Sequence, residues 1–214
     1  MNSCAKPKTF RNERGGRCRP SKKSFTSLSE IVRDYIANCR RDEDAELEYF
    51  SSPPKLRAAI RIAALAINED GKRHPHQRRI PGDTLEHFRR ALTRKRKALR
   101  SSKTFPELMQ ISEKVAEGFW KNSKLTVYDT TLRIGAYLGI QPDRIYLHAG
   151  ARKGAMALGF KGSLLFLKRS QLPKEFRKLK PYELEHCLCI YKNHLKRSKL
   201  KGGGQRRSRF RNQF

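Results

Sequence analysis

The chain has 214 residues, of which 49 are Lys or Arg and 20 are Asp or Glu, so its formal net charge is +29. Its hydrophobic fraction of 37% is low and its charged fraction of 32% is high for a globular protein. The length allows one domain with a hydrophobic core and leaves little room for two. A charge of this size destabilises the compact state by self-repulsion and is tolerable when a polyanion such as a nucleic acid neutralises it, so nucleic acid is the first candidate partner.

Hydropathy and cysteine usage set the expected compartment. No segment approaches the roughly 18 consecutive apolar residues of a membrane span, and the first ten residues lack the apolar region of a signal peptide. A basic amphipathic helix with exposed aromatic residues and a lipidation signal are also absent, which argues against a membrane surface as the partner. The five cysteines are odd in number and irregularly spaced. We therefore expect reduced thiols, no disulfide, and a cytoplasmic protein, nucleoid-associated if it is bacterial.

Basic residues dominate both ends of the chain. Residues 1–24 contain eight Lys or Arg against one Glu, and residues 195–214 contain eight and no acid. Few large apolar side chains accompany them, so we expect two disordered basic arms around a folded domain of residues 25–194. The arms contribute +7 and +8 to the charge of +29, which leaves +14 for the folded domain. The domain is therefore basic in its own right.

The first half of this domain predicts helices bounded by capping signals. Ser27 and Glu30 have the spacing of a capping box ahead of a helix over 28–40. The pair Pro53-Pro54 opens a second helix, which Gly71 stops. Between these helices, the acidic segment 42–48 could dock a basic arm when no ligand is bound.

Asp83 can cap a third helix, which runs into the densest basic cluster of the domain. Residues 72–103 contain twelve Lys or Arg against two acids. A solvated helix face is the plain alternative for one charge run, but two further basic segments flank this one. We therefore favour binding of a phosphate backbone, which carries no sequence information by itself. The residues expected to contact phosphate are Arg89, Arg90, Arg94, Lys95, Arg96, Lys97 and Arg100.

The second half continues the helical pattern, so the predicted fold class is mainly α, a single compact helical domain. Thr104 and Glu107 form a second capping box, and Trp120 is expected to end that helix in the core. The remaining signals are a helix from about Thr126 closed by Gly139, a helix over 150–158 capped by Gly159, an extended segment over 163–167 and a helix starting at Pro181.

The segment from Leu147 to Ala155 carries the most specific expectation. Small residues lead into a helix whose first-turn N–H groups and dipole attract phosphate, and two basic side chains add formal charge there. The alternative is a tight helix–helix contact in which Gly and Ala permit close approach. The surrounding charge favours phosphate, so the expected nucleic-acid contacts are His148, Gly150, Ala151, Arg152 and Lys153.

Residues 126–159 resemble the helix-hairpin-helix module of DNA-binding proteins, whose hairpin reads L-x-G-x-G-x-x-x-A. Leu147 and Ala155 match the ends of this pattern, whereas the two family glycines fall on Ala149 and Ala151. The resemblance implies a helix-hairpin-helix-like C-terminal half that binds DNA through its backbone amides.

A more specific resemblance is to DNA glycosylases with lyase activity, which carry Arg-Lys after this hairpin and use the lysine as a Schiff-base nucleophile. Lys153 occupies that place, following Arg152. The family also has an activating aspartate further along the chain, and residues 154–214 contain no Asp. Many members hold an iron–sulfur cluster on C-terminal cysteines, where this chain has only Cys187 and Cys189. Without an activating partner, a lysine stays protonated, so catalysis by Lys153 is the alternative and not the main hypothesis.

No cofactor or metal site is expected. Cys187 and Cys189, two residues apart on a helix beside His186, point to different faces, and phosphate-loop and dinucleotide motifs are absent. Our main hypothesis is a non-enzymatic nucleic-acid-binding protein, with DNA favoured over RNA and no protein partner identified. The alternatives are a DNA glycosylase or lyase using Lys153, and an RNA-binding or ribosome-associated assembly protein.

Overall fold

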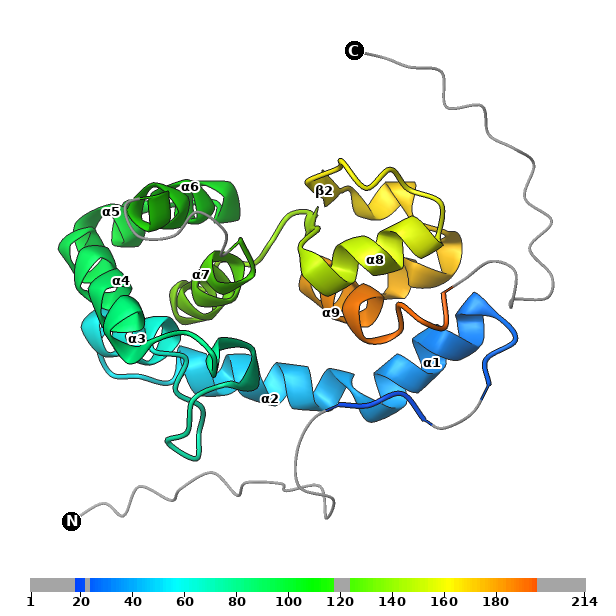
Figure 1. Cartoon of the computed structure of the whole chain (residues 1–214), viewed down its shortest axis with the longest axis horizontal. Helices are drawn as coiled ribbons and strands as arrows, with labels where there is room; N and C mark the ends of the chain where they lie inside the picture. The colour runs from blue at the N-terminus through cyan, green and yellow to red at the C-terminus, as the bar shows by residue number, and fades with distance from the viewer. Residues whose placement is uncertain (1–17, 22–23, 118–123, 196–214) are drawn as a thin grey trace.

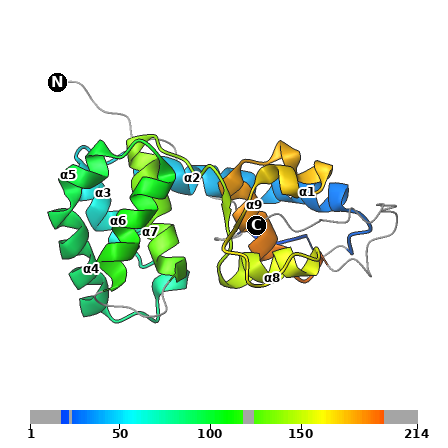
Figure 2. The same ribbon diagram turned by 90° about the horizontal axis from the view of Figure 1, so that it is seen from above.

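A computed structural model describes residues 18–21, 24–117 and 124–195, and over these residues the chain is mainly helical, as expected. Most of both predicted arms, residues 1–17, 22–23 and 196–214, lies outside the described residues, as does Trp120. The described helices form two lobes that are separated in both views and bridged by one long helical segment (Figures 1 and 2). No helix in this part of the chain is long and apolar enough to cross a membrane.

The bridging segment consists of α1 (Leu28–Asn38) and α2 (Arg40–Ser51), which follow each other directly with a break at Cys39. The predicted cap is present, because the Ser27 hydroxyl accepts from the Glu30 N–H, but the Glu30 carboxylate accepts from the N–H of Thr26, one residue before the position that a capping box requires. Leu28, Ile31 and Val32 of α1 pack into the second lobe, while α2 runs on towards the first.

The first lobe is built around one hydrophobic cluster that includes Phe88, Leu92, Phe105 and Tyr128. The predicted helix after Pro53-Pro54 ends well before Gly71, which instead has φ of +72° in the turn of an isolated bridge. The elements of this lobe are α3 (Leu56–Ala64), the short 3₁₀ helix η1 (Pro75–Gln77), α4 (Gly82–Arg94), α5 (Arg96–Ser101), α6 (Phe105–Glu117) and α7 (Lys124–Leu138).

The second lobe packs its own cluster around Leu184, Leu188 and Tyr191. The extended segment expected over 163–167 is in part a strand, whose register pairs Ile145 with Leu167 in an antiparallel ribbon. The elements are β1 (Ile145–Tyr146), α8 (Ala149–Ala157), β2 (Phe166–Leu167), the 3₁₀ helices η2 (Arg169–Gln171) and η3 (Lys174–Lys178), and α9 (Pro181–Ile190).

Two further helix ends follow the capping signals closely. Gly139 after α7 and Gly159 after α8 both have positive φ, +71° and +96°, which is the left-handed conformation that glycine adopts at helix C-termini. The third predicted helix begins at Gly82, one residue before Asp83, and it stops at Lys95. The basic cluster 94–97 therefore spans the break between α4 and α5.

The two helices of the expected hairpin do not pack as a pair. Residues 139–148 separate α7 from α8 and contain β1. The helix α7 packs against α2, α3 and α6 in the first lobe, whereas α8 packs against α9 in the second. Ala149, which falls on a glycine of the helix-hairpin-helix pattern, has φ of +29°.

The expectation of reduced cysteines without a disulfide is wrong for one pair. Cys18 and Cys39 are bonded, with their Cα atoms 4.7 Å apart. Residues 18–21 therefore lie against α1, where the Ser21 N–H also donates to Asp34 at 3.0 Å. Their separation of 21 residues matches no spacing that identifies a disulfide from sequence, so the pairing depends on tertiary structure. Cys187 and Cys189 are free thiols.

Candidate nucleic-acid interface and interlobe polar cluster

The outer surface of α4 and α5 holds most of the predicted phosphate contacts. The apolar residues of α4, among them Leu85, Phe88 and Leu92, face the core of the first lobe, so its charged residues lie on the opposite side of the helix. From the last residue of α4 onward, five cations are exposed and have no ionic partner among the described residues. We call these five the α4–α5 basic surface: Arg94, Lys95, Arg96, Lys97 and Arg100.

The two remaining arginines of this helix are already paired. Arg89 donates to both oxygens of Glu86 at 2.6 and 2.7 Å, and its side chain is 18% exposed. Arg90 reaches the same carboxylate at 3.1 Å but remains 60% exposed. The hydrogen bonds from Arg89 and then Arg90 hold the pKa of Glu86 at about 2, so the carboxylate stays ionised. Arg89 is therefore a structural residue, and Arg90 is available on the edge of the basic surface.

Gly150 and Gly154 pack α8 tightly against α9. A Cβ atom at Gly150 would overlap the side chain of Cys189, and one at Gly154 would overlap the carbonyl group of Leu188. Ala151 is fully buried beside them. The tight helix–helix contact, which was the alternative interpretation of this segment, is therefore what the structure contains.

Arg152 and Lys153 have different surroundings. The Arg152 guanidinium donates to the carbonyl oxygens of Leu147 at 2.7 Å and Gly162 at 3.0 Å. These hydrogen bonds connect α8 to the chain segments that precede and follow it. Lys153 is exposed, and no carboxylate among the described residues pairs with it. Of this pair, only Lys153 is free to meet a phosphate, and the activating carboxylate of a lyase is missing from the described part of its surroundings.

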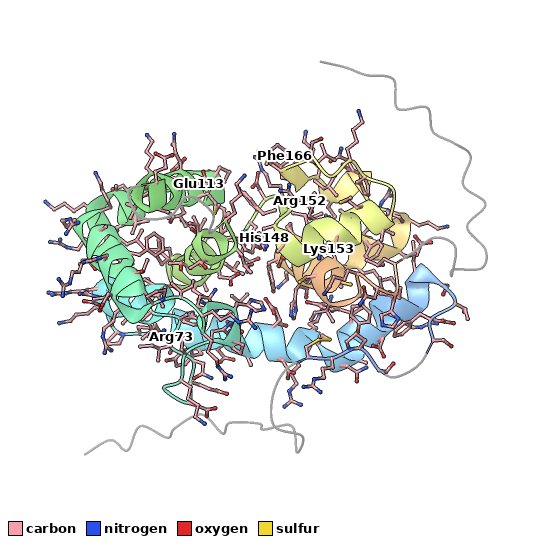
Figure 3. All side chains as sticks on the ribbon, viewed as in Figure 1. Arg73, Glu113, His148, Arg152, Lys153 and Phe166 are labelled. Carbon is pink, nitrogen blue, oxygen red and sulfur yellow. A yellow bond between two sulfur atoms is a disulfide. The ribbon has the colours of Figure 1, made fainter. Side chains whose placement is uncertain are left out.

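His148 is buried between the two lobes, next to the carboxyl group of Glu185 (Figure 3). Its Nδ1 lies 3.6 Å from a carboxylate oxygen of Glu185, and its ring centroid lies 4.6 Å from that of Tyr128. Burial lowers the pKa of His148 to about 4, so the ring is neutral at pH 7. Its Nε2 and the Tyr128 hydroxyl are buried without a hydrogen-bond partner among the described residues. His148 therefore offers an acceptor or donor to an interior site and not to a passing backbone.

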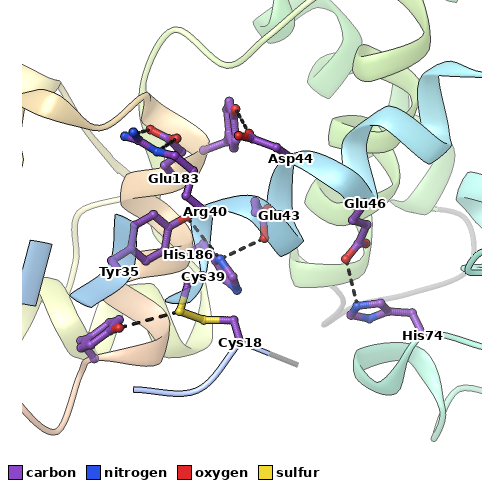
Figure 4. A network of polar contacts seen from close by, with 12 residues as sticks. Cys18, Tyr35, Cys39, Arg40, Glu43, Asp44, Glu46, His74, Glu183 and His186 are labelled. Carbon is purple, nitrogen blue, oxygen red and sulfur yellow. Dashed lines mark hydrogen bonds and ion pairs between the residues drawn. A yellow bond between two sulfur atoms is a disulfide. The ribbon is translucent and has the colours of Figure 1, made fainter. Parts of the chain in front are cut away.

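His148 belongs to a larger group of ionisable side chains where α2 passes between the lobes. We call it the interlobe polar cluster. Its members come from five regions that are distant in sequence, and Figure 4 shows part of the network. They are Glu43 and Glu46 of α2, His74 and His76 near η1, Asp129 and Arg133 of α7, His148, and Glu185 and His186 of α9.

The acidic residues of α2 are used within this cluster. Glu43 accepts from His186 at 2.9 Å, while Glu46 contacts Arg133 at 3.2 Å and His74 at 3.5 Å. Glu43 and Glu46 are therefore engaged within the folded domain, and docking of a basic arm on the segment 42–48 stays a prediction, because most of both arms lies outside the described residues. The sequence shows two acids one helical turn apart, which is equally typical of a solvated helix.

Asp129 of α7 makes a further set of contacts within the interlobe polar cluster. The amide of Gln77 donates to its carboxylate at 2.7 Å, and Nδ1 of His76 lies 3.4 Å away. Burial opposes ionisation of Asp129, but the hydrogen bond with His76 and the charge of Arg133 outweigh it and lower its pKa. Asp129 is therefore a buried carboxylate.

Glu185 has the opposite behaviour. Burial raises its pKa well above the ordinary value, and the charge of His186 opposes this only in part. For His186, burial lowers the pKa, but the charge and hydrogen bond of Glu43 raise it to about 9. The cluster thus brings together one carboxyl group whose pKa is raised, one whose pKa is lowered and a neutral imidazole. This combination can transfer protons.

A metal site does not emerge from this cluster. Among the described residues, no group of three or more His, Cys, Asp or Glu side chains has an arrangement that could hold a metal ion. No sequence signal identifies the cluster, because its members are single polar residues in otherwise unrelated helices and loops. No known protein family, curated protein or solved structure matches this chain.

Proposed function

We propose that this protein binds nucleic acid through the phosphate backbone, with DNA favoured, and that the α4–α5 basic surface is its main folded contact. One observation carries the proposal: five exposed cations lie together without ionic partners among the described residues. Cations that are not neutralised within the fold condense anions from solution, and a polyphosphate binds there by releasing its own counterions. Arg90 and Lys153 add exposed charge, and the basic arms supply the rest.

The test is the salt dependence of binding to a short DNA duplex. The variant Lys95→Gln/Arg96→Gln/Lys97→Gln removes three charges from the surface, and Gln keeps the helix propensity. The slope of log affinity against log salt should fall by up to about 2.7, since each phosphate contact contributes about 0.9. The matched control, Lys174→Gln/Arg177→Gln/Lys178→Gln, removes three exposed charges from η3. Equal losses in both variants would refute a dedicated surface on α4 and α5.

RNA binding is a variant of the same proposal, because phosphate contacts do not distinguish the two polymers. Competition between duplex DNA and structured RNA of equal length separates them. Preferential displacement by RNA would favour an RNA-bound or ribosome-associated role over DNA binding.

A second candidate is an acid–base enzyme that acts on the bound nucleic acid through the interlobe polar cluster. The observation that favours it is the opposite direction of the pKa shifts of Asp129 and Glu185 beside His148. The assay is product analysis of DNA and RNA after incubation, including abasic and base-damaged duplexes. A product formed by the wild type and lost in Asp129→Asn would support it. Borohydride trapping on an abasic duplex tests the lyase alternative, and an adduct that survives Lys153→Ala eliminates Lys153.

A further inference from the structure

We propose that β2 and its surroundings form a stacking platform for unpaired nucleobases, so that the protein prefers single-stranded segments of nucleic acid. This inference rests on the proposed function and narrows its substrate. It concerns a surface of the second lobe that is separate from the α4–α5 basic surface.

The first observation is a concentration of exposed apolar side chains. Among the described residues, the large hydrophobic side chains left exposed are Met156 at 53%, Leu165 at 58% and Phe166 at 42%. All three fall within eleven consecutive positions of the chain. Single exposed apolar residues need no explanation, whereas several that gather on one lobe indicate an interaction surface.

The second observation is that the Phe166 ring is held in place. The neighbouring Leu167 is fully buried, and side chains alternate along a strand, so the pairing of β1 with β2 directs Phe166 outward. The Arg144 guanidinium covers one face of the ring at 4.7 Å from its centroid, and Asp143 holds that guanidinium at 2.7 Å. A base that stacked on the other face would complete a cation–ring–base sandwich without reordering the ring.

The loop that precedes β2 is also fixed. Arg152 binds the carbonyl oxygen of Gly162, and Gly162 lies against the side chain of Met156. In Figure 3, Phe166 lies at the upper edge of the second lobe, and Arg152 lies below it. The role of Arg152 thus shifts from the phosphate contact expected from the sequence to support of the exposed surface.

The third observation is the charge around the ring. Residues 144–174 contain seven Lys or Arg and no Asp or Glu. Those on the surface near β2 and α8 are exposed and without an ionic partner in the described part of the chain: Lys153, Lys161, Lys168 and Arg169. An aromatic platform among cations suits a single strand, whose phosphates meet the cations while its bases stack. A duplex keeps its base faces covered and would gain only the charge.

A lipid surface has the same phosphate chemistry, but the geometry favours the nucleic acid. Insertion into a bilayer needs a continuous apolar face, and the one large hydrophobic side chain that α8 exposes is Met156. Its other apolar side chains pack against α9 or are small. A single ring with a stacked guanidinium is better matched to a planar base.

The test compares a mixed-sequence single strand with a duplex of the same length, using the full chain and the variants Phe166→Ala, Phe166→Leu and Phe166→Trp. We expect Phe166→Ala to weaken single-strand binding about 5- to 150-fold and duplex binding by less than about twofold. Phe166→Trp should retain the wild-type affinity, and Phe166→Leu should behave like Phe166→Ala, because leucine keeps apolar contact but cannot stack. Circular dichroism melting verifies that each variant is folded.

Each other outcome refutes a defined part of the argument. Equal losses on single strand and duplex, or wild-type affinity in Phe166→Leu, would overturn the platform and leave backbone binding intact. If the wild type bound no nucleic acid, both the platform and the proposed function would fail. Vesicles of phosphatidylcholine with and without phosphatidylserine form the last arm, and binding lost in Phe166→Ala there but not on the single strand would assign the surface to lipid.

Discussion

Replacing Gly154 with alanine tests whether the segment 147–155 is a packing contact or a phosphate site. In an ordinary exposed helix, Gly→Ala stabilises a protein by about 0.5–1 kcal/mol, because glycine has the larger conformational entropy when unfolded. At Gly154, the added Cβ would overlap the carbonyl group of Leu188, so α8 and α9 must separate. Overpacking of this kind costs about 1–3 kcal/mol, so we expect a net destabilisation of about 1–2 kcal/mol.

The measurement is urea or thermal unfolding of the full chain. A loss of this size should lower Tm by about 2–8 °C for a domain of this length. The matched control is Gly82→Ala at the first residue of α4, where the new Cβ would lie 3.5 Å from the Arg73 side chain, an ordinary contact. The control should be neutral or stabilising. If Gly154→Ala were as stable as the wild type, the two helices would not approach as closely as we describe, and a phosphate site at this turn would regain support.

Three further changes test the disulfide and the interlobe polar cluster by unfolding experiments. Cys18→Ser should lower the free energy of unfolding by about 3 kcal/mol under oxidising conditions, because it removes the disulfide with Cys39. A reductant should destabilise the wild type by a similar amount and leave the variant unchanged. Equal stability of wild type and variant without reductant would show that Cys39 is unpaired in solution. The pKa of His148 is lowered to about 4, so stability should fall as pH drops from 6.5 to 4, and His148→Gln should flatten that slope. The pKa of His186 is raised to about 9, so the stability contributed by its protonated ring is fully present below pH 6.5 and is lost as the pH rises through 9. Glu43→Gln should abolish this loss of stability at alkaline pH.

Helix ends were predictable because their signals are local. A capping hydroxyl, a proline in a first turn or a glycine with positive φ acts within one or two turns of the chain, as at Ser27, Pro181, Gly139 and Gly159. The break at Lys95 has no such signal, since Lys and Arg are good helix formers on both sides of it. The packing of α5 against α3, α4 and α6 accompanies that break.

The interlobe polar cluster was not predictable for the opposite reason. Each member is consistent with an exposed position on its own helix, and only the tertiary fold brings Glu43 to His186 and Glu46 to Arg133. The glycines of α8 were ambiguous in the same way, because a residue without a side chain fits both a phosphate site and a close helix contact. The position of the partner helix α9 decides between them.

The carboxylates of this cluster also change how the net charge should be understood. Glu46 offsets the buried Arg133, and the buried Glu183 offsets Arg40 at 2.7 Å, so these charges cancel close to the protein interior. An acid that is neutralised inside the fold cannot neutralise a lysine on the surface. The cations at the end of α4, on α5 and around Phe166 therefore face the solvent without local compensation among the described residues. The positive charge is therefore more concentrated at these surfaces than it would be if the charge of the folded domain were spread uniformly. A concentrated positive potential favours binding of a polyanion at particular surfaces over binding across the whole domain.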